Sequence, residues 1–208
     1  MNIGSAHAND EKDISEPLTN NVLDDTMIEV EVKAKINSFK QIEEKLKEIG
    51  AVKTKVELQE DIYFNSPVVD FAKTDEALRI RTTRQDGNEN IFITYKGPKI
   101  DAKSKTRKEI EMGIDDSVKC SDIFEAIGFE KVRAVRKNRQ YFAYENFEIS
   151  LDDIEGLEPY MEIEIALEDG EDYNDAQDSI FEMFEKLGIT DGFERTSYLE
   201  LLENLNND

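Results

Sequence analysis

Charged and apolar residues alternate along five separate stretches of the chain. Residues two apart on a β-strand point to the same side of the sheet, so each stretch predicts a strand with one polar and one apolar face. The polar faces carry acids and bases together, at a density that favours a lined interior over simple solvent exposure. The five stretches are Glu29/Glu31/Lys33, Arg79/Arg81, Arg107/Glu109/Glu111, Lys137/Arg139 and Glu162/Glu164.

Turn and capping residues divide the chain into further elements. Ser38 and Gly50 are suited to begin and end a helix between them, and Asp86-Gly87-Asn88 is typical of a hairpin turn. Besides the first strand over 27–36, the pattern predicts strands near 53–64, 77–84, 90–96, 106–113, 130–143, 146–154 and 160–167, and helices at about 39–49, 117–127, 175–187 and 196–205.

An internal repeat relates the two halves of this series. Ile49-Gly50 and Tyr63-Phe64 match Ile127-Gly128 and Tyr141-Phe142 at a shift of 78 positions, and the same shift carries the first charged strand onto Arg107, Glu109 and Glu111. Two such halves facing each other predict a closed barrel around the charged positions, with helices outside, and closure removes exposed sheet edges. Chance similarity between two amphipathic stretches is the competing explanation.

Composition places these elements in one soluble domain. The chain has 208 residues, of which 38% are hydrophobic and 36% charged, and we expect a disordered extension over 1–26 and a single domain over 27–205. The formal charge of −22 disfavours nucleic acid and anionic membranes as partners. No secretory signal or membrane-spanning run is present, and Cys120 is the only cysteine, so we predict a cytoplasmic location.

The charged positions define the candidate chemistry. The only histidine, His7, lies in the extension, so the ligands left for a metal are hard oxygens, which suit Mg²⁺ or Mn²⁺. The acids are Glu29, Glu31, Asp152, Glu162 and Glu164; the bases are Lys33, Arg79, Arg81, Lys96, Arg107, Lys137 and Arg139. A basic row of this length suits a triphosphate, and no GxxxxGK or GxGxxG loop is present. One charged pair alone would indicate a solvated strand face, but five stretches favour a site.

These residues resemble a known family. Glu29-Val30-Glu31-Val32-Lys33 has the ExExK form of the CYTH domain, whose members are triphosphate tunnel metalloenzymes. The resemblance runs through most of residues 27–202. Seven further segments resemble the class IV adenylyl cyclase-type branch of the family: Gln59-x-Asp61-Ile62-Tyr63-Phe64, 70–81, Thr94-Tyr95-Lys96-Gly97-Pro98, 105–109, Leu151-Asp152, Glu162-Ile163-Glu164 and 197–202.

The resemblance implies an α+β fold, an eight-stranded antiparallel closed β-barrel with helices packed outside, that binds a triphosphate with Mg²⁺ or Mn²⁺. It implies metal binding by the five acids, phosphate binding by the seven bases, and catalytic roles for Glu29, Glu31 and Lys33. A homodimer is common in this branch.

Three functions follow from this interpretation. The first is a class IV adenylyl cyclase that converts ATP to cyclic AMP and pyrophosphate. The second is an inorganic, thiamine or nucleoside triphosphatase that releases orthophosphate. The third is a non-catalytic protein that binds a triphosphate. The absence of tryptophan argues mildly against a dedicated thiamine triphosphatase, because no indole is available to stack on the thiazole ring.

Overall fold

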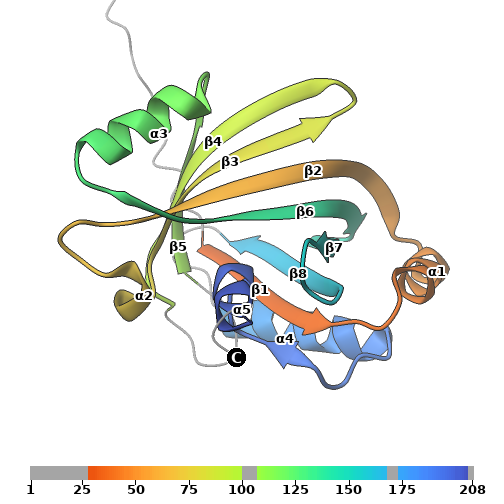
Figure 1. The fold of residues 1–208 in the computed structure, drawn as a ribbon. Helices are drawn as coiled ribbons and strands as arrows, with labels where there is room; N and C mark the ends of the chain where they lie inside the picture. Colours follow the sequence, from red (N-terminus) through yellow and green to blue (C-terminus); the bar gives the residue numbers. More distant parts are fainter. Residues whose placement is uncertain (1–27, 100–106, 168–172, 206–208) are drawn as a thin grey trace, which may run out of the picture.

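The structure is a computed structural model that describes residues 28–99, 107–167 and 173–205. Within these residues, antiparallel strands form a single sheet, and the five helices found there lie outside it (Figure 1). The strands are β1 (Ile28–Lys35), β2 (Val52–Asn65), β3 (Ala77–Gln85), β4 (Asn88–Lys96), β5 (Arg107–Ile114), β6 (Glu130–Tyr144), β7 (Phe147–Ile154), β8 (Tyr160–Leu167) and β9 (Phe193–Glu194). The helices are α1 (Phe39–Ile49), α2 (Phe71–Thr74), α3 (Ser117–Ala126), α4 (Tyr173–Lys186) and α5 (Tyr198–Asn204).

The sheet closes into a barrel. The strands follow the order β5-β4-β3-β2-β6-β7-β8-β1, and β1 also pairs with β5, where Glu29 lies opposite Arg107. The short strand β9 pairs with β1 as a ninth strand. The predicted fold class, an eight-stranded antiparallel closed barrel with helices outside, is therefore confirmed.

The order of elements repeats along the chain. Each half consists of a strand, a helix and three strands: β1, α1 and β2 to β4, followed by β5, α3 and β6 to β8. Helix α1 and strand β2 begin at Phe39 and Val52, and α3 and β6 begin at Ser117 and Glu130, 78 positions later in both cases. The halves interlock, because β2 pairs with β6 and β1 pairs with β5.

The apolar faces of the strands point outward, under the helices. Val30, Val32 and Ala34 of β1 pack with Ile180 and other apolar residues of α4, and the same cluster includes Ile42 and Leu46 of α1. Figure 1 shows α4 running along the β1 and β8 side of the barrel. Because side chains alternate across a strand, burying one face beneath helices turns the charged positions to the interior.

The local elements agree with their sequence signals, with two additions. Gly50 ends α1 in the left-handed conformation at φ 89°, and Asp86 and Gly87, at φ 50° and 81°, connect β3 to β4. The prediction did not include α2 or β9, which have four and two residues. The predicted disordered extension over 1–26 lies outside the described residues. Within the described part of the chain, no helix has the length and apolar character needed to span a membrane.

Candidate functional site

A cavity of about 240 Å³ occupies the barrel interior, and charged side chains dominate its lining. Every predicted site residue except Lys33 and Asp152 lines this cavity. The lining contains eight acids (Glu29, Glu31, Asp61, Glu109, Glu111, Glu148, Glu162 and Glu164) and six bases (Arg79, Arg81, Lys96, Arg107, Lys137 and Arg139). We call this space the tunnel. The acids outnumber the bases, so a polyanion entering the tunnel needs further positive charge.

Two arginines of β3 share one carboxylate from β2. Arg81 donates from Nε and Nη2 to the two oxygens of Asp61, at 2.7 Å each, and Arg79 Nη1 lies 3.4 Å from Asp61 Oδ2. Burial alone would raise the pKa of Asp61, but Arg81 and Arg79 hold it well below its usual range. The two guanidinium groups are thus held side by side, facing the tunnel, with only one negative charge between them.

A second group of paired charges lies on β6, β7 and β8. Arg139 donates from Nε to Asp152 Oδ1 at 2.6 Å and also contacts Glu162, and Lys137 Nζ lies 3.5 Å from Asp152 Oδ2. Tyr198 of α5 donates its hydroxyl to the same Asp152 oxygen at 2.8 Å. Asp152, fully buried, therefore lies in the wall behind the cations, where it orients Arg139 and Lys137.

Burial and the neighbouring Arg139 lower the pKa of Lys137 from 10.5 to about 7, although Asp152 opposes that shift. Near neutral pH this side chain is therefore divided between amine and ammonium, and an approaching phosphate oxygen would favour the protonated ammonium form.

Carboxylates also gather where β7, β8 and β1 lie side by side. Glu31 of β1 and Glu148 of β7 both lie directly across from Glu164 of β8, so three acids stand in a row on neighbouring strands. Burial raises the pKa of Glu164 well above its usual range, and Glu29 and Glu31 raise it further. Like charges on facing strands repel each other, and a bound cation would relieve that repulsion.

Lys96 joins this acidic side to the basic side. Its Nζ contacts Glu109 and lies 3.8 Å from Glu29 Oε2. Burial raises the pKa of Glu29 from 4.5 to about 7; Lys96 opposes the shift and Glu109 adds to it. Burial would also raise the pKa of Glu109, but Lys96 and Arg79 bring it below its usual value. We call Glu29, Glu109 and Glu164 the acid cluster.

Lys33, the last residue of the ExExK stretch, lies outside the tunnel lining. Its ammonium group donates to the carbonyl of Thr196 and lies 4.1 Å from the centre of the Tyr198 ring. The side chain is only 1% exposed. In this position Lys33 connects the start of α5 to β1. The alternation along β1 could not predict this contact, because alternation indicates which side of the strand a side chain occupies but not which residues lie beside it.

The donor chemistry fits a divalent metal, although no site is assembled in advance. Among the described residues, no group of three or more histidine, cysteine, aspartate or glutamate side chains is arranged to hold an ion. The acid cluster offers oxygen donors alone, which suit Mg²⁺ or Mn²⁺. The raised pKa values of Glu29 and Glu164 show that negative charge is poorly compensated there.

Four acidic lining residues, Asp61, Glu109, Glu111 and Glu148, were not among the predicted site residues although their strands were predicted. Glu109 and Glu111 belong to the alternating stretch of β5, and Asp61 shares its side of β2 with Gln59 and Tyr63. The signal that identifies Asp61 is its register: it lies directly opposite Arg81 on β3.

Known proteins share both the sequence pattern and this architecture. The CYTH domain family matches residues 27–198. A Methanocaldococcus jannaschii protein named "Putative adenylate cyclase MJ0240" is 46% identical over 176 residues, which cover 84% of this chain and 98% of that protein. The solved structure of PH1819 from Pyrococcus horikoshii OT3 has 42% identity and a TM-score of 0.80, and the match covers 85% of this chain and 99% of that one.

The closed charged barrel and the family match identify this chain as a member of the CYTH domain family. A more distant solved structure has the same fold: HpAC1 from Hippeastrum, called a "putative adenylyl cyclase" with a dominant triphosphatase activity, at 18% identity and a TM-score of 0.63, over 85% of this chain and 95% of that one. At that identity the likeness shows the fold alone.

Proposed function

We propose that this protein is a metal-dependent enzyme that converts ATP to cyclic AMP and pyrophosphate. One observation carries the proposal: eight acids and six bases line a single cavity inside a closed barrel. A triphosphate carries enough negative charge to take over the guanidinium and ammonium groups, while the acids left behind suit divalent cations. The name of the M. jannaschii relative, which is 46% identical, supports the cyclase assignment.

The chain's own residues would perform two tasks. Arg79, Arg81 and Arg139 would bind phosphate oxygens and stabilise the charge that grows on the departing pyrophosphate. Glu29, Glu31, Glu109 and Glu164 would hold Mg²⁺ or Mn²⁺, with Glu162 and Asp152 exchanging their contacts with Arg139 to join them. When bound, the metal would supply the positive charge that polarises the 3′-hydroxyl and the α-phosphate. In the proposed reaction the 3′-oxygen would form a bond to the α-phosphorus, and the bond from the α-phosphorus to the oxygen bridging to the β-phosphate would break. Pyrophosphate would leave with that oxygen, and the 3′-hydroxyl proton would pass to water.

A triphosphatase is the second candidate, because the same cradle would serve it. Four cations of the tunnel lining are each at most 8% exposed, and a terminal phosphate could be held among them for attack by water: Arg79, Arg107, Lys137 and Arg139. A protein that binds a triphosphate without turnover is the third. The cytoplasmic location and a homodimeric state stay predictions.

The products distinguish the three candidates. Purified protein is incubated with ATP or with tripolyphosphate, in the presence of Mg²⁺ or Mn²⁺ and after their removal by a chelator. We expect cyclic AMP and pyrophosphate from ATP, and no turnover without metal. Release of orthophosphate instead would identify a triphosphatase. Binding of the triphosphate without any product would identify the third candidate, a protein that binds a triphosphate without turnover.

A pair of arginine variants on β3 provides the control. Arg79→Ala is expected to weaken triphosphate binding by a factor of about ten or more, since a hydrogen bond to a charged group contributes about 1.5–3 kcal/mol. Arg84→Ala removes an exposed arginine of the same strand, whose partner is Glu89 at 2.8 Å, and should change binding little. Equal effects would place Arg79 outside the site.

A further inference from the structure

Tyr141 of β6 lines the tunnel but has no role in the proposed function. It follows Arg139 by two positions, so both side chains lie on the inner side of β6, and the guanidinium carbon of Arg139 is 5.6 Å from the centre of the Tyr141 ring. Burial raises the pKa of the Tyr141 hydroxyl, although the charges of Arg139 and Arg81 oppose the shift, so the hydroxyl keeps its proton at neutral pH. A protonated hydroxyl beside two arginines is a suitable donor to an anion that both arginines bind.

A hydrogen bond from Gln59 determines where the hydrogen of this hydroxyl can point. Gln59, on the neighbouring strand β2, donates from Nε2 to the Tyr141 hydroxyl oxygen at 2.8 Å. The hydroxyl is the acceptor in that bond, so its own hydrogen points elsewhere. In the part of the chain that the structure describes, the Tyr141 hydroxyl has no other hydrogen-bond partner. Its hydrogen is therefore available to a ligand in the tunnel.

Glu57 holds the amide of Gln59 in this orientation. The same Nε2 also donates to Glu57 Oε2 at 2.9 Å. Burial alone would raise the pKa of Glu57, but hydrogen bonds from Lys55 and Gln59 bring it below its usual value, so Glu57 is a charged carboxylate that can only accept. Rotating the amide by half a turn would place Gln59 Oε1 against this carboxylate, and the two acceptors would repel each other.

An unpaired oxygen supports the view that Gln59 is held against its own preference. Gln59 Oε1 is buried and has no hydrogen-bond partner among the described residues, which is unfavourable for a buried acceptor. In the rotated amide this oxygen would face the Tyr141 hydroxyl and accept its hydrogen. The charge of Glu57 therefore keeps Gln59 in the donating orientation and keeps the tyrosine hydrogen out of a bond within the protein.

We propose that Tyr141 donates a hydrogen bond to an oxygen of the phosphate group that Arg81 and Arg139 bind, and that Gln59 and Glu57 are positioning residues that direct this donor into the tunnel. The inference rests on the proposed function, because it requires a triphosphate in the tunnel, but it holds for cyclisation, for hydrolysis and for binding without turnover. A neutral donor suits this place, since Arg81 and Arg139 already repel each other and a third cation would add to that repulsion.

Tyr141→Phe tests the donor, because it removes the hydroxyl and keeps the ring. The dissociation constant of tripolyphosphate is measured by calorimetry at a constant Mg²⁺ concentration. We expect binding to weaken by about tenfold, or about 1.4 kcal/mol, in keeping with the loss of one hydrogen bond to a charged group. Tyr144→Phe is the matched control: it removes a hydroxyl of the same strand that lies outside the tunnel lining and accepts from Lys186 at 2.9 Å, and it should not change binding.

Glu57→Gln tests the positioning role, because electrostatics alone predicts the opposite sign. Removing a negative charge near the tunnel and releasing Lys55 from its ion pair would strengthen the binding of a polyanion. We expect binding to weaken by about three- to tenfold instead, because Gln59 can then rotate and accept the tyrosine hydrogen. The matched control, Glu60→Gln, removes the same charge from the outer side of β2, where Glu60 pairs with Arg136, and should not weaken binding.

The double variant separates positioning from every other effect of Glu57. In the Tyr141→Phe background there is no hydroxyl to direct, so Glu57→Gln should no longer weaken binding. Unchanged affinity in Tyr141→Phe would overturn the proposal while the proposed function stands. Tighter binding in Glu57→Gln, or an equal loss in both backgrounds, would overturn the positioning role. A wild-type protein that binds neither tripolyphosphate nor ATP would overturn the proposed function and this inference with it.

Discussion

The tunnel cations are bound to carboxylates that belong to the protein itself. Asp61 forms ion pairs with Arg79 and Arg81, Asp152 forms one with Arg139, and Glu109 forms one with Lys96. Such buried pairs cost desolvation energy that their attraction only partly returns, so they contribute little net stability, but removing one partner leaves a costly buried charge. Under the proposed function, binding of a triphosphate would therefore exchange the carboxylate partner for phosphate at each of these cations.

Removing Asp61 should show this exchange directly. Asp61→Asn keeps the shape of the side chain but leaves two buried guanidinium groups without a carboxylate, so we expect the free energy of unfolding to fall by about 3–5 kcal/mol. Tripolyphosphate should then raise the melting temperature of the variant more than that of the wild type. Glu89→Gln, which breaks the exposed pair with Arg84, is the control and should cost about 0–1 kcal/mol.

The effect of Asp61 should also depend on pH in a defined direction. The pKa of Asp61 in the folded protein lies below its value of 3.8 in the unfolded chain, so its stabilisation is present above about pH 4 and is lost as the pH falls further. The difference between the wild type and Asp61→Asn should therefore shrink below about pH 4. A difference that stays constant into the acid range would mean that the carboxylate charge is not what stabilises this pair.

Glu29 should act in the opposite sense. Its pKa in the folded protein is raised from 4.5 to about 7, so the metal-free wild type loses stability as the pH rises through that window. At about pH 8, Glu29→Gln should be more stable than the wild type by about 1–3 kcal/mol, with the lower end expected because the side chain is partly exposed. The gain should narrow towards about pH 4.5.

Chemical denaturation with and without Mn²⁺ measures both aspects of this prediction. Mn²⁺ should stabilise the wild type at about pH 8 and the variant much less, since one oxygen donor has lost its charge. Glu48→Gln, on the exposed surface of α1, should respond to Mn²⁺ as the wild type does. A variant that is destabilised, yet keeps the full metal response, would remove Glu29 from the metal site.

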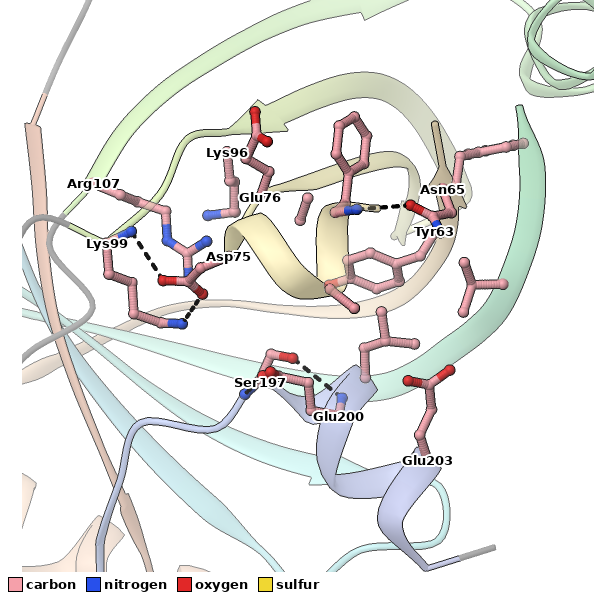
Figure 2. A pocket seen from close by; sticks show the side chains of 16 residues that line it. Tyr63, Asn65, Asp75, Glu76, Lys96, Lys99, Arg107, Ser197, Glu200 and Glu203 are labelled. Atoms are coloured by element: carbon pink, nitrogen blue, oxygen red, sulfur yellow. Dashed lines mark hydrogen bonds and ion pairs between the residues drawn. The ribbon is translucent and has the colours of Figure 1, made fainter. Parts of the chain in front are cut away.

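At the scale of elements, β1 and α5 are coupled through one side chain. Lys33 on β1 donates to the Thr196 carbonyl and packs on the Tyr198 ring, while Ser197 and Glu200 form a capping box at the start of α5. Helix α5 has seven residues, which is too short to be stable alone in water. Its position beside the cavity that Phe71 of α2 and Leu199 of α5 line (Figure 2) therefore depends on these contacts.

Lys33→Met tests that dependence, because methionine keeps an unbranched apolar side chain but loses the donor and the charge. We expect amide hydrogen exchange in α5 to accelerate by about tenfold, since a hydrogen bond from a charged group contributes about 1.5–3 kcal/mol. Exchange in α4 should stay unchanged. An unchanged α5, combined with a loss of tripolyphosphate affinity as large as that of Arg79→Ala, would show instead that Lys33 binds phosphate directly.

The sequence predicts the regular elements well, because period-two and helical patterns extend over many residues in each. It does not predict α2, whose four residues span a single helical turn, or β9, whose two residues carry no period. Alternation also defines which side of a strand a residue occupies but not its depth. For that reason the alternation could not predict that Asp152 lies behind Arg139 or that Lys33 packs against α5; the metal-binding role of Asp152 and the phosphate-binding role of Lys33 stay predictions.

At the scale of the whole molecule, the two halves form one barrel only together. Strands β2 and β6 pair along most of their length, and β1 pairs with β5, so each half supplies the other's neighbouring strands. The 78-residue repeat predicts the closure. It could not predict which acids meet which bases, because that depends on the register between strands far apart in the sequence.

The position of the apolar core outside the barrel has a consequence for how such a protein can be changed. Val30, Val32 and Ala34 contribute to packing from one side of β1, while Glu29 and Glu31 face the lumen from the other. Residues that stabilise the fold and residues that line the tunnel thus alternate along the same strand. Substitutions at the inward positions could therefore change which anion the tunnel accepts, while the outward residues continue to specify the barrel.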